Sequence, residues 1–188
     1  QERLNQYGYL SDNIDTAFFY KGNMNTTNPT ISEKWNDGVG IINYRGWGNA
    51  QGWVKPQFFS SPDASSLSNN FKLPVVFSFV CNTGDFGNDV DPSFGEALLR
   101  VGSFQAPKGA VAMIGPSDLD TDTRFNNVMC GALWDGLLEG RTPELAQALH
   151  AAKQAVAKEF DGVYEPCKIG ASCTQQYIPV FYHHVYGV

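Results

Sequence analysis

The chain has 188 residues, a length that fits one domain with a substantial core. Lys and Arg number 13 against 19 Asp and Glu, which gives a formal net charge of −6. This acidic balance argues against a nucleic-acid partner or an anionic membrane surface, because both favour a basic face. No apolar run of about 18 residues is present, so the sequence predicts no membrane span.

The first predicted elements are a short strand and a helix. Residues 16–20 (TAFFY) are apolar and aromatic, which favours a strand. Thr30 and Glu33 have the Ser/Thr-x-x-Glu spacing of a capping box, so a short helix is expected to begin there and to end at Gly38. A buried strand is expected over residues 39–44.

The next stretch is predicted to carry a turn, a loop and the central strand. Residues 45–48 (RGWG) are expected to form a Gly-rich turn, and residues 49–70 are rich in Ser, Pro, Asn and Gly, which favours a loop. Residues 73–80 (LPVVFSFV) are apolar on both faces, as is typical of a central parallel strand, and this strand leads to Cys81.

The second half of the chain continues the alternation of helices and strands. Its predicted elements are a helix opened by a second capping box over 93–101, a strand over 110–114, helices over 125–138 and 143–160, and a last strand over 177–186. The order predicts one α/β domain over residues 1–188, with a mostly parallel sheet and helices on both faces.

Two Gly-rich turns follow strands, at residues 45–48 and 81–84. If these strands are neighbours, about 4.8 Å apart, the two turns face each other across one crevice at the carboxyl edge of the sheet. A cysteine there could act as a nucleophile, which requires a thiolate, a nearby base and backbone N–H donors. The alternative is that Cys81 is a small buried apolar residue of the core.

Several stretches, in order between Thr30 and Val188, resemble the gingipain-type cysteine peptidases. They are GVGIINYRGWGN (38–49), LPVVFSFVCNTGDF (73–86), SFGEALLR (93–100), KGAVAMIGPS (108–117) and YHHVYG (182–187). The resemblance implies a caspase-like three-layer α/β fold and hydrolysis of a protein or peptide substrate. It implies Cys81 as the nucleophile and Gly48 as the source of an oxyanion-hole N–H.

The departure from the family pattern is Trp47, which occupies the position of the catalytic histidine. An indole N–H is only a donor and cannot accept a proton from a thiol. General acid–base help is worth about 10²–10⁴-fold in rate. Two functions therefore stay open, an active endopeptidase and a degenerate relative that serves as a binding or scaffold module.

None of the three histidines is expected to replace the missing base. His150 is expected on the exposed face of its helix, and His183 and His184 on opposite faces of the last strand, with one of them buried. Arg45 could act on a thiol electrostatically but cannot shuttle a proton, so a structural or rim role is expected for it.

Other residues have both a functional and a plain interpretation. Asp85, with two further Asp residues of its loop, could bind a basic substrate side chain or calcium, or could belong to a solvated turn. Trp47 and Trp53 could line a ligand groove or pack over the end of the sheet. No cofactor is required and no metal ligand is assigned. The resemblance makes structural calcium possible, here or in the alternating Asp residues of loop 118–122.

Cys167 and Cys173 bracket a short Gly-containing loop. They could form a disulfide, which favours an oxidising compartment, or they could be free thiols. With the resemblance, this leads us to expect a secreted or cell-surface protein.

Overall fold

The computed structural model describes residues 28–55, 58–140, 142, 144–167 and 173–187. Its centre is a four-stranded sheet, whose strands in spatial order are β1 (Ile41–Arg45), β5 (Val75–Phe79), β6 (Ala112–Pro116) and β9 (Tyr186–Gly187). The first three strands are parallel, and β9 is antiparallel to the end of β6. The predicted mostly parallel sheet is confirmed, and the strand predicted over residues 16–20 lies outside the described residues.

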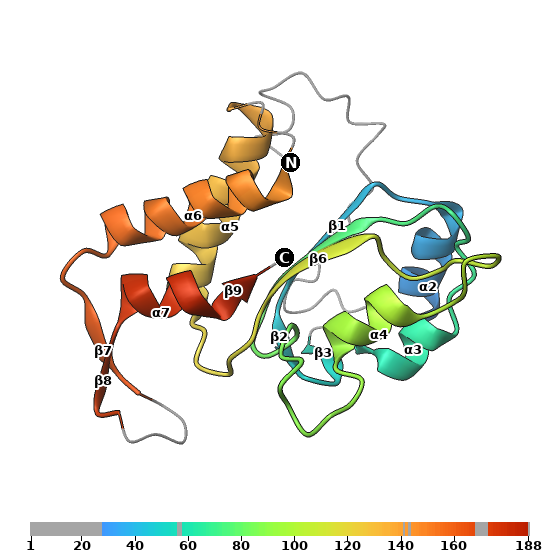
Figure 1. Ribbon diagram of the computed structural model, residues 1–188, viewed down its shortest axis with the longest axis horizontal. Coiled ribbons are helices and arrows are strands. Elements are labelled where there is room, and N and C mark those ends of the chain that lie inside the picture. Colours follow the sequence, from blue (N-terminus) through green and yellow to red (C-terminus); the bar gives the residue numbers. More distant parts are fainter. Residues whose placement is uncertain (1–27, 56–57, 141, 143, 168–172, 188) are drawn as a thin grey trace.

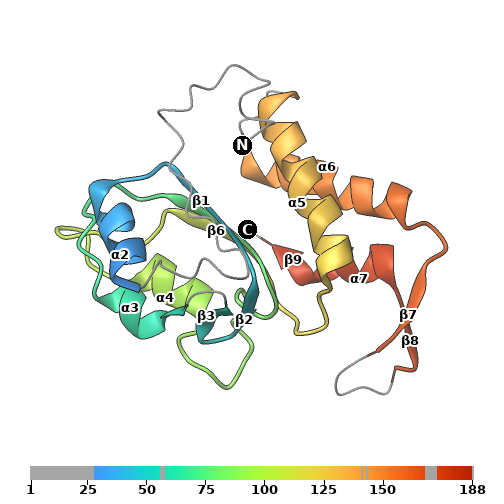
Figure 2. The ribbon, with the colours of Figure 1, turned by 180° about the vertical axis from the view of Figure 1, so that it is seen from behind.

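Helices cover both faces of this sheet (Figures 1 and 2). One layer contains α2 (Asn28–Asp37), α3 (Ser61–Ser65), α4 (Phe94–Arg100) and a small antiparallel sheet of β2 (Trp47–Asn49), β3 (Gly52–Lys55) and β4 (Phe59–Ser60). The other layer contains α5 (Thr123–Leu138), α6 (Leu145–Glu159) and α7 (Ile178–Val185), with a hairpin of β7 (Tyr164–Pro166) and β8 (Gln175–Tyr177) before α7. The predicted three-layer α/β architecture is confirmed.

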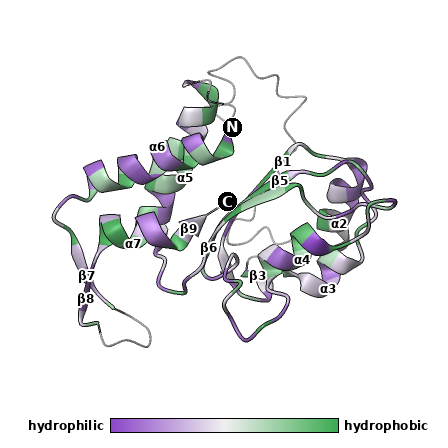
Figure 3. Ribbon diagram, viewed as in Figure 1, coloured by the Kyte–Doolittle hydropathy of each residue, from purple (hydrophilic) through white to green (hydrophobic). Residues whose placement is uncertain are grey.

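Alternate residues of β5 point into the two layers, because successive side chains of a strand lie on opposite faces. Phe77 and Phe79 belong to a buried cluster with α5, α6 and α7. Val76, together with Val80 just beyond the strand, belongs to a second cluster with α2, α4 and the small sheet. β5 is accordingly hydrophobic apart from Ser78, whereas α6 shows hydrophilic and hydrophobic bands (Figure 3). The sheet thus separates two cores, and β5 contributes to both.

The prediction of a loop over residues 49–70 is wrong. This stretch forms β3, β4 and α3, and it buries Trp53 and Phe59 with their ring centroids 5.7 Å apart. α3 begins at a capping box in which Asp63 accepts the backbone N–H and the hydroxyl of Ser60, both at 2.8 Å. Strands of two to four residues are too short for a hydrophobic period to reveal them, and the turn-forming residues between them dominate the pattern.

The prediction of a last strand over residues 177–186 is also wrong. Most of this stretch forms α7, with Pro179 in its first turn. Its aromatic and β-branched residues favour a strand. However, Ile178, Tyr182 and Val185 are buried with helical spacings of four and three residues. Tertiary packing of this apolar stripe therefore overrides the local strand preference.

The remaining predicted helices are present, although α2 begins at Asn28, so the Thr30–Glu33 spacing lies inside the helix and does not mark its start. α4 begins after Ser93, whose backbone N–H and hydroxyl both donate to a carboxylate oxygen of Glu96 at 3.0 Å. α2 ends before Gly38, which has a φ of 98° that favours glycine. No helix in the described part of the chain is long and apolar enough to cross a membrane.

Candidate active site

β1 and β5 are parallel neighbours, with Arg45 opposite Phe79 in the register. The segments that follow them therefore begin side by side, as the sequence predicts. The predicted turn over residues 45–48 is shorter than expected, because Arg45 ends β1 and Trp47 already begins β2. A Cβ placed on Gly48 would lie 3.1 Å from Thr83 Cγ2 and 3.2 Å from Val80 Cγ1. The backbone of Gly48 thus lies directly against the segment that carries Cys81.

The sulfur of Cys81 is partly exposed and contacts one residue of the loop after β6. Thr121 Oγ1 donates a hydrogen bond to Cys81 Sγ at 3.2 Å, and Sγ donates to the carbonyl oxygen of Thr121 at 3.5 Å. These are the hydrogen bonds of Sγ within the part of the chain that the structure describes. The sequence did not single out Thr121. The rule that loops at the carboxyl edge of neighbouring strands meet could have placed its loop beside Cys81.

A buried chain of hydrogen bonds lies under the turn at Cys81. Trp53 Nε1 donates to Ser78 Oγ at 3.0 Å, and Ser78 Oγ lies 2.9 Å from Thr83 Oγ1. Thr83 Oγ1 also donates to the carbonyl oxygen of Val80 at 3.2 Å. Trp53 is 2% exposed, so it packs over the end of the sheet and does not line a ligand groove.

Backbone contacts fix the turn after Cys81 from two sides. Asn82 has a φ of 60°, and its N–H donates to the carbonyl oxygen of Asp118 at 2.9 Å. The N–H of Gly84 donates to Pro116 O, and the N–H of Gly95 in α4 donates to Thr83 O, both at 2.9 Å. The end of β6 and the start of α4 therefore hold the turn in place.

Trp47 lies at the edge of the site with 72% of its surface exposed. The pairing of β2 with β3 is irregular between Trp47 and Gly48, so the two residues do not follow the regular alternation of a strand. Beneath them, Tyr44 Oη donates to Lys55 O at 2.5 Å and to Trp47 O at 3.3 Å. Burial raises the pKa of Tyr44, which keeps this hydroxyl a donor.

The structure brings no histidine into hydrogen-bond contact with Cys81, and all three histidines of the chain are described. His150 is exposed on α6 and lies 3.1 Å from Gln154, as expected for a surface position. His183 and His184 are both exposed on α7, so the expectation that one of them is buried in a strand is wrong. The base that a cysteine peptidase requires is therefore absent from the contacts of Sγ.

Asp85 directs its carboxylate at its own loop. Its two oxygens accept the backbone N–H of Gly87 at 3.1 Å and the side-chain amide of Asn88 at 3.2 Å. Among the described residues, no group of three or more His, Cys, Asp and Glu side chains is placed to hold a metal ion. Substrate binding by Asp85 and structural calcium both stay predictions.

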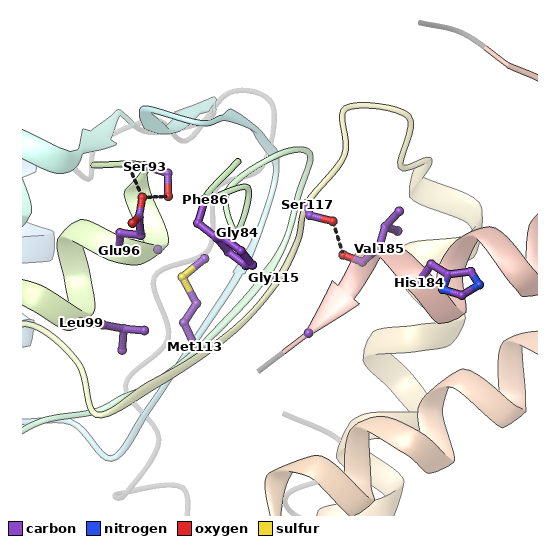
Figure 4. A pocket seen from close by; sticks show the side chains of 12 residues that line it. Gly84, Phe86, Ser93, Glu96, Leu99, Met113, Gly115, Ser117, His184 and Val185 are labelled. Carbon is purple, nitrogen blue, oxygen red and sulfur yellow. Dashed lines mark hydrogen bonds between the residues drawn. The ribbon is translucent and has the colours of Figure 1, made fainter. Parts of the chain in front are cut away.

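A cavity of about 420 Å³ is lined by residues of α4, β6, α7 and β9 (Figure 4). Phe86, Leu99 and Met113 form much of its apolar wall, and Glu96 and His184 are among its polar residues. It touches the loop after Cys81 at Gly84 and Phe86, but Cys81 is not part of its lining. The cavity is therefore a neighbour of the Cys81 turn and not the site of the sulfur itself.

Comparisons with known proteins give one consistent result. The sequence matches peptidase family C25 over residues 2–179. It is 30% identical over 134 residues to gingipain R2 of Porphyromonas gingivalis, a match that covers 68% of this chain and 17% of that protein. It is 29% identical over 134 residues to gingipain R1 of the same organism, which covers 68% of this chain and 13% of that protein. The chain thus spans less than a fifth of the length of these relatives.

Solved structures show the same fold. The crystal structure of the Arg-specific cysteine proteinase gingipain R superimposes with a TM-score of 0.70 at 24% identity, covering 86% of this chain and 36% of that one. A second solved protease superimposes with a TM-score of 0.71 at 21% identity, covering 96% and 40%. The expected caspase-like α/β fold is therefore present, and with the match along nearly its whole length the chain belongs to peptidase family C25.

Proposed function

We propose that this domain is a gingipain-type peptidase domain that binds a protein or peptide at the edge formed by Cys81 and Gly48, but that hydrolyses peptide bonds slowly or not at all. The observation that carries the proposal is that residue 47, which the resemblance to the gingipain-type peptidases aligns with the catalytic histidine, is a tryptophan. The domain would act as a degenerate relative that serves as a binding or scaffold module.

The chemistry of peptide cleavage explains why this one position matters. A base must remove the thiol proton before sulfur attacks the carbonyl carbon, and an acid must then protonate the departing amine. The indole of Trp47 can donate but cannot accept a proton. The hydroxyl of Thr121, which donates to Cys81 Sγ, is not a base at neutral pH. We therefore expect any turnover to be lower by about 10²–10⁴-fold than with a histidine in place.

Two features support retention of a binding edge. Cys81 is partly exposed at the tip of β5, and the backbone of Gly48 lies against the same turn. A peptide carbonyl placed between them would meet a sulfur on one side and main-chain groups on the other. Such an arrangement can hold an extended peptide without transferring a proton.

The test compares four proteins on a mixed peptide library: the native chain, Trp47→His, Cys81→Ala, and the double variant. We expect the native chain to cleave no faster than Cys81→Ala. We expect Trp47→His to gain cleavage by roughly 10²-fold or more, since it regains a base, and the double variant to lose that gain. Rapid cleavage by the native chain that disappears in Cys81→Ala would overturn the proposal.

That overturning result would establish the second candidate, an active endopeptidase with Cys81 as its nucleophile. The presence of a partly exposed sulfur at the tip of the central strand favours this candidate.

Thermal unfolding with and without calcium and a chelator, measured on the same proteins, tests the prediction of a structural calcium ion.

We further propose an oxidising compartment, at the cell surface or outside the cell. Cys167 and Cys173 are joined in a disulfide, and such bonds persist mainly in those compartments. Mass spectrometry of the protein isolated without reductant checks the bond, and two free thiols at these positions would remove this support.

A further inference from the structure

Arg45 is the last residue of β1, and its side chain reaches across the end of the sheet. Its Nη1 donates to the carbonyl oxygen of Phe79 at 2.8 Å. Its Nη2 donates to the carbonyl oxygen of Thr123 at 3.3 Å and to the side-chain oxygen of Asn127 at 2.5 Å. All three acceptors are neutral, so these contacts position the guanidinium without cancelling its charge.

The cation of Arg45 has no carboxylate within ion-pair distance among the residues that the structure describes. The ion pairs found there involve Arg100 and Arg124 instead. Asp122, which precedes α5, accepts the backbone N–H of Arg124 as the helix cap. Arg45 is half-buried, and a fixed, partly desolvated cation attracts anions more strongly than a fully hydrated one does.

The guanidinium of Arg45 contacts the same two segments of the chain that meet at Cys81 and Thr121. Phe79 and Thr123, whose carbonyls hold the guanidinium, each stand two residues from the pair Cys81 and Thr121, which contact each other. Two residues of chain span at most about 7 Å, so the backbone positions that hold the charge and the sulfur are offset by no more than this along each segment. Burial raises the pKa of Tyr182, and Asp122, Cys81 and Arg45 all act on its hydroxyl electrostatically. The Asp122 carboxylate therefore lies in the same neighbourhood and opposes the cation there without forming an ion pair with it.

We propose that Arg45 makes the Cys81 site select anionic ligands, and that in a bound peptide it favours an Asp or Glu side chain next to the backbone carbonyl that faces Cys81. The proposal rests on the proposed function for the binding of a peptide, and it adds the chemical class of that peptide. The sequence predicts that Asp85 selects a basic side chain, whereas Arg45 would select an acidic one. The structure favours Arg45, because the carboxylate of Asp85 accepts hydrogen bonds from its own loop.

The first experiment measures the alkylation of Cys81 by iodoacetate and by iodoacetamide, read by peptide mapping so that Cys130, the other free cysteine of the described chain, is quantified separately. Both reagents react with the same thiolate, so the thiolate fraction cancels in the ratio of the two rates. The ratio then reports the preference for an anion. It is independent of whether the domain hydrolyses peptides.

We expect Arg45→Gln to lower the iodoacetate-to-iodoacetamide ratio about three- to tenfold at low ionic strength, and added salt to shrink the difference. Gln keeps side-chain amide donors, and Arg45→Lys, which keeps the charge, should retain most of the native ratio. The matched control is Arg124→Gln, which removes the same charge from the start of α5, where Arg124 pairs with Glu165 at 2.6 Å. An unchanged ratio in Arg45→Gln, an equal fall in Arg124→Gln, or no alkylation of Cys81 by either reagent in the folded protein would overturn the proposal.

The second experiment measures the binding of labelled peptides that differ at one position, occupied by Asp, Asn or Lys, by fluorescence anisotropy. We expect native affinity to fall in the order Asp, Asn, Lys, and Arg45→Gln to level the order while Arg124→Gln keeps it. A native preference for Lys that disappears in Asp85→Asn would reject the role of Arg45 and leave peptide binding itself intact. Rapid Cys81-dependent hydrolysis, in contrast, would reject the proposed function without changing the charge preference.

Discussion

Gly48 is held so close to the turn after Cys81 that a side chain has no room there. A Cβ would lie 2.9 Å from the carbonyl oxygen of Gly52, in addition to its contacts with Thr83 and Val80. This crowding explains why a glycine stands at this position of the site, and it has a measurable consequence.

We expect Gly48→Ala to lower the free energy of unfolding by roughly 1–3 kcal/mol, because backbone and packed side chains must move to admit the methyl group. Urea unfolding followed by fluorescence measures the change. The matched control is Gly40→Ala, since an added Cβ at Gly40 meets nothing within 4 Å. Equal effects of the two substitutions would show that the crowding at Gly48 is not what constrains it.

Single residues also mark the limit of what the sequence could predict about the site. The spacing of strands and glycines placed Cys81 and Gly48 at one edge, because that depends only on neighbouring strands. It could not place Thr121 against the sulfur or the Arg45 guanidinium on the carbonyl of Phe79. Those contacts depend on the path of a loop and the reach of a long side chain, which have no sequence period.

At the scale of elements, the short helix α4 depends on its first turn. The backbone N–H and hydroxyl of Ser93 both donate to Glu96, and Gly95 N–H holds the turn after Cys81 through Thr83 O. Hydrogen bonding from Ser93 lowers the pKa of Glu96 below its usual value of 4.5. The charged carboxylate is therefore the form that stabilises the fold.

We expect Glu96→Gln to lower the melting temperature at neutral pH and to lose this effect in acid. A carboxyl group whose pKa is depressed in the folded state stabilises the fold at pH values above its usual pKa of 4.5. This stabilisation disappears as the pH falls through the folded-state pKa. Thermal melts across this pH range measure it. A difference between variant and native protein that stays constant with pH would contradict the role of the charge.

Elements with long, regular hydrophobic patterns could be predicted from the sequence. Short elements, and segments whose residue types favour one structure while their buried positions follow another, could not. The apolar run of β5 and the capping box of α4 can be read locally and are confirmed. α7 was predicted as a strand because its aromatic and β-branched residues favour one, whereas its three buried positions follow the helical period. The decision between the two required knowing which core the segment packs against.

At the scale of the whole molecule, three tyrosines connect the two cores to the carboxyl edge of the sheet. Tyr44 lies in one core, and Tyr182 and Tyr186 lie in the other, with their ring centroids 5.7 Å apart. Burial raises the pKa of all three. The folded state therefore favours the neutral phenols.

We expect the domain to lose stability steeply in alkali. A tyrosine whose pKa is raised in the folded state stabilises the fold in full at pH values below the ordinary tyrosine pKa of 10.0. This stabilisation is lost as the pH rises above 10.0, because the tyrosines of the unfolded chain ionise first. A spectroscopic titration should find tyrosines that ionise only together with the loss of circular dichroism. Tyr182→Phe should reduce their number by one, and reversible ionisation of every tyrosine without unfolding would contradict the prediction.

The exposure of Trp47 gives the protein an intrinsic optical signal at the candidate site. Of the four tryptophans, Trp35 and Trp53 are sealed in one core, whereas Trp47 presents 72% of its surface to solvent. A water-soluble quencher therefore reaches the emission of Trp47 far more readily than that of these two. A molecule that binds beside Cys81 should shield Trp47 from the quencher. Binding to a site with little or no turnover can therefore be measured by tryptophan fluorescence.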